Sequence, residues 1–164
     1  LLAARTIARL SACARGWQSR SALLDKLTTG GFNRRFQPVK TGCEWITSDE
    51  EIAASYGRDP LRCFRFTVNA YDNMFVSIGE AQSARRMKGI PKSLPLLLIS
   101  GECDPVGGFG KGVRAAYARY RAAGLQQVCC LLYPGCRHEL LNEVNRETVY
   151  ADLLDWMNAH MAAG

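Results

Sequence analysis

The sequence has no long hydrophobic run. It has 164 residues, of which 48% are apolar and 22% are charged, and this composition is typical of one globular domain. No stretch approaches the roughly 20 consecutive apolar residues that a transmembrane helix needs. We therefore predict that the chain has no transmembrane segment.

The sequence also has no C-x-x-C pair and no regular spacing among its seven cysteines. This argues against a disulfide scaffold and predicts a reducing, cytoplasmic location. A metal site from Cys129, Cys130, Cys136 and His138 is not expected, because neighbouring residues of a strand point to opposite faces. The two strand residues Cys129 and Cys130 are expected to be buried and inert.

No acidic residue occurs among the first 24 residues, which contain four arginines. Such a segment superficially resembles a targeting peptide, but an amphipathic helix of the domain itself is the simpler interpretation. The chain begins with Leu1 rather than Met. We expect either a processed terminus or a piece of a longer chain.

The positive charge of the chain lies in its first part. The net charge is +6 overall; residues up to Gly101 carry +7 and the remainder −1. The basic residues are scattered, and no nucleic-acid-binding motif accompanies them, so we expect no nucleic-acid partner. The glycine-rich stretch from Gly107 to Gly112 lacks the G-x-x-x-x-G-K-[ST] pattern, so no nucleotide is expected. No metal or organic cofactor is implied elsewhere in the sequence.

The pattern of apolar residues changes near Pro91. Helical periodicity over about 3–13, 48–56 and 70–88 predicts a mostly helical region, 1–90, of the kind that forms a cap or lid. Residues 91–164 then alternate between buried-type strands and amphipathic helices. Strands are expected at 94–100 and 126–133, and helices at 111–123 and 145–161.

This alternation predicts an α/β fold with a parallel sheet and flanking helices. Two parallel strands cannot form a complete sheet of this class, because their buried-type edges would be open. The remaining strands are therefore expected to precede Leu1.

Two residues able to carry chemistry follow the two expected strands. Ligands of open α/β sheets bind at the carboxyl ends of the strands, and the loops there contain Asp104 and His138. A carboxylate next to an imidazole can fix its tautomer and stabilise its protonated form, which makes the histidine a general base. We predict that Asp104 and His138 are catalytic. Glu139, Asn142 and Glu143 could orient or cap the following helix, and His160 is expected to be structural or exposed.

At these residues the sequence resembles α/β-hydrolases of the monoacylglycerol lipase and lysophospholipase type, the serine aminopeptidase S33-like group. The resemblance rests on G-x-x-D-P-V at Gly101–Val106 and P-G-x-x-H-E at Pro134–Glu139. The stretch from Phe32 to Leu61 is similar, less specifically, to the helical cap of such enzymes. The resemblance implies that Asp104 orients His138 and that a serine in a G-x-S-x-G elbow is the nucleophile.

The chain contains no such elbow. The nearest matches surround Ser55, which follows a polar run, and Ser77, which follows a bulky Phe where the tight turn needs a small residue. Cys103 and Cys136 flank the two catalytic candidates, but neither lies on an elbow. We therefore expect no nucleophile in this chain, and no hydrolase activity from the 164 residues alone.

The resemblance implies an ester hydrolase with a small, lipid-like substrate and, as a partner, the N-terminal half of the same enzyme. The aromatic residues of the cap would supply an apolar acyl-chain pocket; they are Phe32, Phe36, Trp45, Phe64, Phe66 and Phe75. Two alternatives stay open. One is a non-catalytic truncated or split-gene polypeptide, and the other is an α/β-hydrolase of different chemistry, such as an epoxide hydrolase, thioesterase or peptidase.

Overall fold

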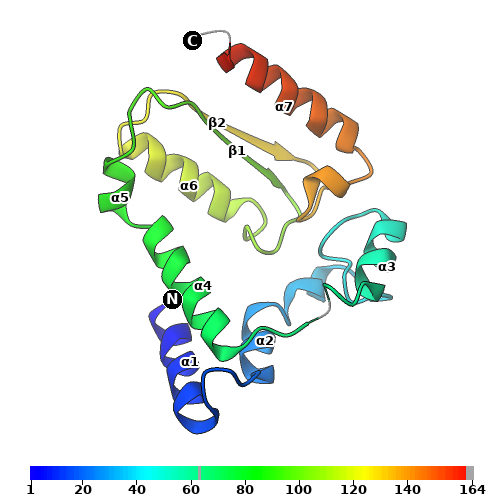
Figure 1. Cartoon of the computed structure of the whole chain (residues 1–164). Helices are drawn as coiled ribbons and strands as arrows, with labels where there is room; N and C mark the ends of the chain where they lie inside the picture. Colours follow the sequence, from blue (N-terminus) through cyan, green and yellow to red (C-terminus); the bar gives the residue numbers. More distant parts are fainter. Residues whose placement is uncertain (63, 162–164) are drawn as a thin grey trace.

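The computed structural model describes residues 1–62 and 64–161, in which helices precede a strand–helix–strand–helix unit (Figure 1). The elements are α1 (Leu2–Arg15), α2 (Ala22–Thr28), α3 (Glu50–Arg58), α4 (Val68–Ala81), α5 (Ala84–Lys88), β1 (Leu96–Gly101), α6 (Lys111–Ala122), β2 (Val128–Tyr133) and α7 (Arg146–Met161), with short 3-10 turns at Phe32–Arg35 and Leu140–Asn142. The predicted α/β class is confirmed. Apart from the helix expected over 70–88, each predicted strand and helix begins and ends within two residues of its predicted bounds.

Two features of the helical region differ from the prediction. The single helix expected over 70–88 is two helices. Ser83, the N-cap of α5, has an extended backbone conformation, which interrupts the helix. Helix α2 was not predicted. It has only seven residues, too few for a periodic pattern, although Ser21 caps it by accepting a hydrogen bond from the backbone N–H of Leu24.

The helical region has its own apolar core, in which α1 packs against α4 and α2. Small residues on α1 allow this close approach. The buried members of the cluster are Ala8, Ala12, Leu24, Val68, Tyr71 and Phe75. The hydroxyl of Tyr71 donates to Asp25 Oδ1 over 2.5 Å, and Arg5 pairs with Asp72 at 3.0 Å, so polar contacts at the edge of this core join the same helices.

β1 and β2 form a parallel pair in which Leu96 lies opposite Val128 and Gly101 opposite Tyr133. Helix α6 connects them, and α6 and α7 lie on opposite sides of the two strands (Figure 1). A second apolar cluster joins the sheet to α7; its buried members are Tyr133, Cys136, Leu140 and Val149. Parallel pairing makes both strands end at the same edge, which is where the loops carrying Asp104 and His138 begin.

The prediction that Cys129 and Cys130 are buried is wrong. Cys129 is exposed and Cys130 is half-buried. The α7 side of the sheet is packed around Ile99 and Tyr133, at the carboxyl end of the strands, so Cys129, near the start of β2 on the face of Tyr133, has little cover. Along the described residues no helix has the length and apolar character that crossing a bilayer requires.

Candidate active site

Asp104 is fixed by the loop that follows β1. Its Oδ1 accepts a hydrogen bond from the backbone N–H of Val106 at 2.8 Å, and its main-chain oxygen accepts one from Phe109 at 2.8 Å. These bonds form a tight turn that an Asp-Pro sequence favours. The residue is only 7% exposed, so its carboxylate is held rigidly and largely away from solvent.

The loop after β2 is bonded directly to the loop after β1. The backbone N–H of Glu102 donates to the carbonyl of Tyr133 over 3.0 Å, and that of Cys103 donates to the carbonyl of Cys136 over 2.8 Å. Gly101 permits this approach, since a Cβ there would lie 2.2 Å from the carbonyl oxygens of both Cys136 and Arg137. The turn from Pro134 to His138 is therefore held against the Asp104 loop.

This arrangement brings the two predicted residues together. Nδ1 of His138 lies 3.2 Å from Oδ2 of Asp104, although the residues are 34 positions apart. The side chain of Asp104 is 9% exposed and that of His138 is 37% exposed. With the carboxylate ionised, Nδ1–H donates to it, which leaves Nε2 as the nitrogen that accepts a proton.

The hydrogen bond to Asp104 raises the pKa of His138 above its ordinary value. Burial opposes this rise, while the negative charges of Asp104 and Glu139 support it. An imidazole whose charged form is stabilised in this way is a stronger proton acceptor than a free one. The pair can therefore perform general base catalysis.

Aromatic side chains from the helical region reach this imidazole. The ring of Trp45 lies 5.1 Å from that of His138, and Phe32 lies 5.0 Å from Trp45. The six aromatic residues expected to form an acyl-chain pocket do not line one pocket together, because Phe64 and Phe66 extend towards Tyr71 and Phe75 is buried in the α1–α4 core. Of the rings expected to form a single pocket, Trp45 is the one that contacts the histidine.

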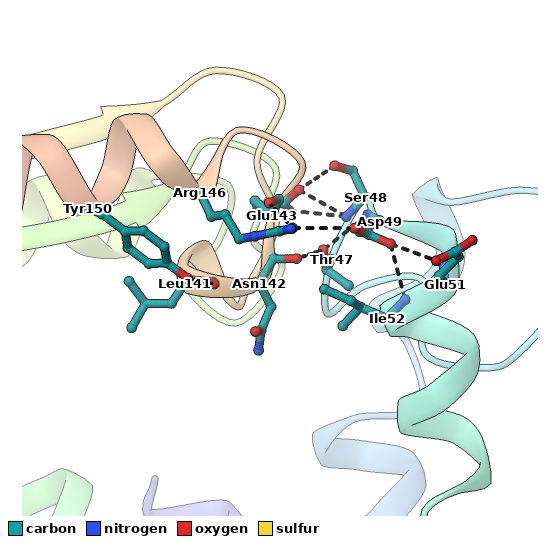
Figure 2. Close-up of polar contacts among 10 residues, drawn as sticks. All are labelled: Thr47, Ser48, Asp49, Glu51, Ile52, Leu141, Asn142, Glu143, Arg146 and Tyr150. Carbon is teal, nitrogen blue, oxygen red and sulfur yellow. Dashed lines mark hydrogen bonds and ion pairs between the residues drawn. The ribbon is translucent and has the colours of Figure 1, made fainter.

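The sequence did not predict that residues 47–49 contact the segment that follows the histidine loop, from Asn142 to Arg146 (Figure 2). The hydroxyl of Thr47 donates to the carbonyl of Asn142 over 2.7 Å. Asp49, whose carboxylate caps α3, pairs with Arg146 at 3.5 Å. Both contacts join residues about 95 positions apart, so no local pattern could have shown them.

Glu143 lies at the centre of these contacts and is 0% exposed. Its carboxylate accepts hydrogen bonds from the backbone N–H of Arg137 at 2.6 Å and from the N–H and hydroxyl of Ser48. Asn142 instead donates to Glu139 at 2.6 Å. The acidic run after His138 was expected to orient or cap the next helix, and the structure shows that Glu143 joins two loops instead.

A cavity of about 490 Å³ lies beside the Asp104 loop. Its walls come from α2, the 3-10 turn after it, and the β1–α6 loop. They are lined by Lys26, Leu27, Thr28, Gly31, Phe32, Arg34, Arg35, Pro105 and Phe109. Arg35 covers the ring of Phe109 at 3.9 Å. The cavity thus combines aromatic and aliphatic surface with positive charge.

The near matches to a nucleophile elbow lie in helices: Ser55 in α3 and Ser77 in α4. Cys136 is 2% exposed, and its burial raises the pKa of its thiol, which disfavours the reactive thiolate. His160 contacts its own helix, with Nδ1 2.7 Å from the carbonyl of Trp156. Within residues 1–62 and 64–161, no group of three His, Cys, Asp or Glu side chains is placed to hold a metal ion.

Parallel strands flanked by helices, with an Asp–His pair at their carboxyl ends, define the class of this protein as an α/β-hydrolase. A model of the family described as serine aminopeptidase, S33, matches residues 6–145. The chain therefore belongs to that family, and the resemblance seen in the sequence is confirmed. No curated protein sequence matches the chain.

Solved structures of esterases and lipases have the same fold. A highly thermostable carboxyl esterase from Bacillus coagulans, in complex with glycerol, is 27% identical with a TM-score of 0.82; the match covers 96% of this chain and 52% of that one. A lipase in its open form is 26% identical, with a TM-score of 0.81 and coverages of 94% and 50%. A monoglyceride lipase from Saccharomyces cerevisiae, 18% identical with a TM-score of 0.61 and coverages of 96% and 49%, shares the fold. The chain spans about half the length of these structures.

Proposed function

We propose that Asp104 and His138 are the acid and the base of a carboxylic ester hydrolase. Nε2 of His138 takes the proton of a serine hydroxyl as its oxygen attacks the ester carbonyl, and returns that proton to the departing alcohol. Water then releases the acyl group by the same proton transfers. Asp104 holds the tautomer and stabilises the imidazolium. The observation that carries this proposal is the 3.2 Å contact between Asp104 Oδ2 and His138 Nδ1.

The nucleophile is proposed to lie on a segment outside these 164 residues. The sequence has no G-x-S-x-G elbow, and its matches span about half of the related structures. On this view residues 1–90 are a cap, residues 91–164 are the last part of the hydrolase core, and the chain alone is inactive. Its partner is the N-terminal half of the same enzyme.

We further propose a lipid-like ester as the substrate. The similar structures are described as a carboxyl esterase and a lipase, and the cavity beside the Asp104 loop has apolar walls that include Leu27, Phe32 and Phe109. A cytoplasmic location is proposed from the seven irregularly spaced cysteines, which suit a reducing compartment.

The test combines gene sequence and activity. The coding sequence upstream of Leu1 should encode a strand followed by G-x-S-x-G; G-x-D-x-x would indicate epoxide hydrolase chemistry, and finding neither would support a non-catalytic polypeptide. The isolated chain should not hydrolyse p-nitrophenyl esters. The chain extended by the upstream segment should do so, with kcat lowered about 10⁶-fold by His138→Ala. Turnover by the isolated chain that His138→Ala abolishes would contradict the proposal.

A further inference from the structure

Glu143 is a buried carboxylate that the proposed proton transfer does not use. It is 0% exposed, and in the part of the chain that the structure describes no ion pair involves it. Burying a carboxylate without a cation is costly unless several hydrogen bonds replace its water. Its acceptor oxygens are therefore occupied by specific donors rather than by a counter-charge.

These donors come from two segments far apart in sequence. Oε1 accepts from the backbone N–H of Arg137 at 2.6 Å, and both oxygens lie close to the N–H of Ser48, at 3.2 and 3.1 Å. The hydroxyl of Ser48 also donates to Oε2. Figure 2 shows the carboxylate directed at Ser48 from the loop that precedes α7.

The position of these bonds matters for His138. Arg137 precedes it and is held by Glu143. Glu139 follows it, and its backbone N–H donates to the carbonyl of Ile46 over 2.7 Å. The backbone is thus anchored on both sides of the histidine to the segment 46–48. These anchors fix the direction of the Cα–Cβ bond of His138.

We infer that Glu143 is a positioning residue, which aligns His138 with Asp104 by anchoring the backbone next to the histidine. The inference rests on the proposed function, because alignment matters for a proton-transferring pair. A glutamine at this position retains one carbonyl acceptor and replaces the other with an NH₂ donor. With the carbonyl in the place of Oε1, the NH₂ group cannot accept the bonds that the N–H and hydroxyl of Ser48 donate to Oε2, so the anchor is weakened at its Ser48 end.

The test uses ¹H–¹⁵N NMR of the imidazoles of the whole chain, which has only two histidines. In the wild type we expect His138 to show a hydrogen-bonded Nδ1 proton that Asp104→Asn removes. Glu143→Gln should remove or broaden the same signal and move the pKa of His138 towards its ordinary value of 6.5. The signals of His160, on α7, should not change.

Two variants separate alignment from charge. Glu139→Gln removes a carboxylate whose charge raises the pKa of His138 but leaves the Glu143 contacts intact, so the pKa should fall while the Nδ1 proton persists. Ser48→Ala keeps every charge and should weaken that signal, even if Glu143→Gln does not fold. An unchanged Nδ1 proton signal in Glu143→Gln would overturn the inference about Glu143 but not the proposed function. If Glu143→Gln does not fold, an unchanged signal in Ser48→Ala has the same meaning. Absence of the signal from the wild type would overturn the proposed function as well.

Discussion

Oδ2 of Asp104 lies 3.2 Å from Nδ1 of His138, and the two side chains come from loops at the ends of two adjacent parallel strands. The contact depends on more than these strands. Gly101 lets the loops touch, Asp104 is locked by its own turn, and the segment 46–48 holds the backbone around His138. Each of these dependences can be tested by a single substitution.

Asp104→Asn should lower the pKa of His138. The hydrogen bond to Asp104 is the largest cause of the raised pKa, and its negative charge acts in the same direction, while burial acts against both. Without the Asp104 carboxylate, only the charge of Glu139 still opposes the effect of burial, which lowers the pKa of His138. A histidine titration by NMR measures this, with His160 as the internal reference. A pKa of His138 that does not change would show that Asp104 does not bind it in solution.

The same pair should make stability depend on pH. Because the pKa of His138 is higher in the folded protein than the ordinary 6.5, protonation favours the folded state. This contribution is fully present below about pH 6.5 and is lost as the pH rises through the folded-state pKa. Urea unfolding of the wild type and of His138→Gln should therefore differ more at about pH 5 than at about pH 9. An equal difference at both pH values would contradict the raised pKa.

Gly101→Ala should destabilise the protein and separate the two site loops. The new Cβ would lie 2.2 Å from two backbone oxygens, which cannot move as a flexible side chain can, so a loss of at least about 1–3 kcal/mol is expected. Gly79→Ala is the control, because the nearest atom to its Cβ is 3.9 Å away and alanine favours the helix by up to about 1 kcal/mol. Similar urea midpoints for the two variants would refute this account of Gly101.

The sequence was informative where local patterns decide structure. The apolar run from Leu94 to Ser100 predicts a buried strand directly, and Gly124 marks the end of the helix before it. Parallel strands then bring the loops of Asp104 and His138 to one edge of the sheet. The partners of Glu143 could not be predicted in this way. Ser48 is 95 positions away, and the segment around it is an irregular turn whose path depends on tertiary contacts. A glutamate close to the histidine was visible in the sequence, but neither its burial nor its partners were.

Arg137→Lys should weaken the attachment of the histidine loop to the helical region. The guanidinium donates to the carbonyls of Glu44 and Thr47, the latter over 3.0 Å, and lies 4.4 Å above the ring of Phe36. A lysine ammonium reproduces neither the planar fork nor the stacking. Because Thr47 is 1% exposed, its carbonyl would lose a partner that water replaces poorly, at a cost of about 1–2 kcal/mol.

Arg119→Lys on the exposed surface of α6 is the matched control for this substitution, since it makes the same chemical change away from the site. Its effect should stay within about 0.5 kcal/mol. Urea unfolding gives both values, and NMR of the imidazoles shows whether His138 alone responds. If the two lysine variants were equally stable and His138 kept its signals in both, the contacts of Arg137 would not hold the loop. A selective loss in Arg137→Lys would show that the helical region positions the proposed base through this side chain.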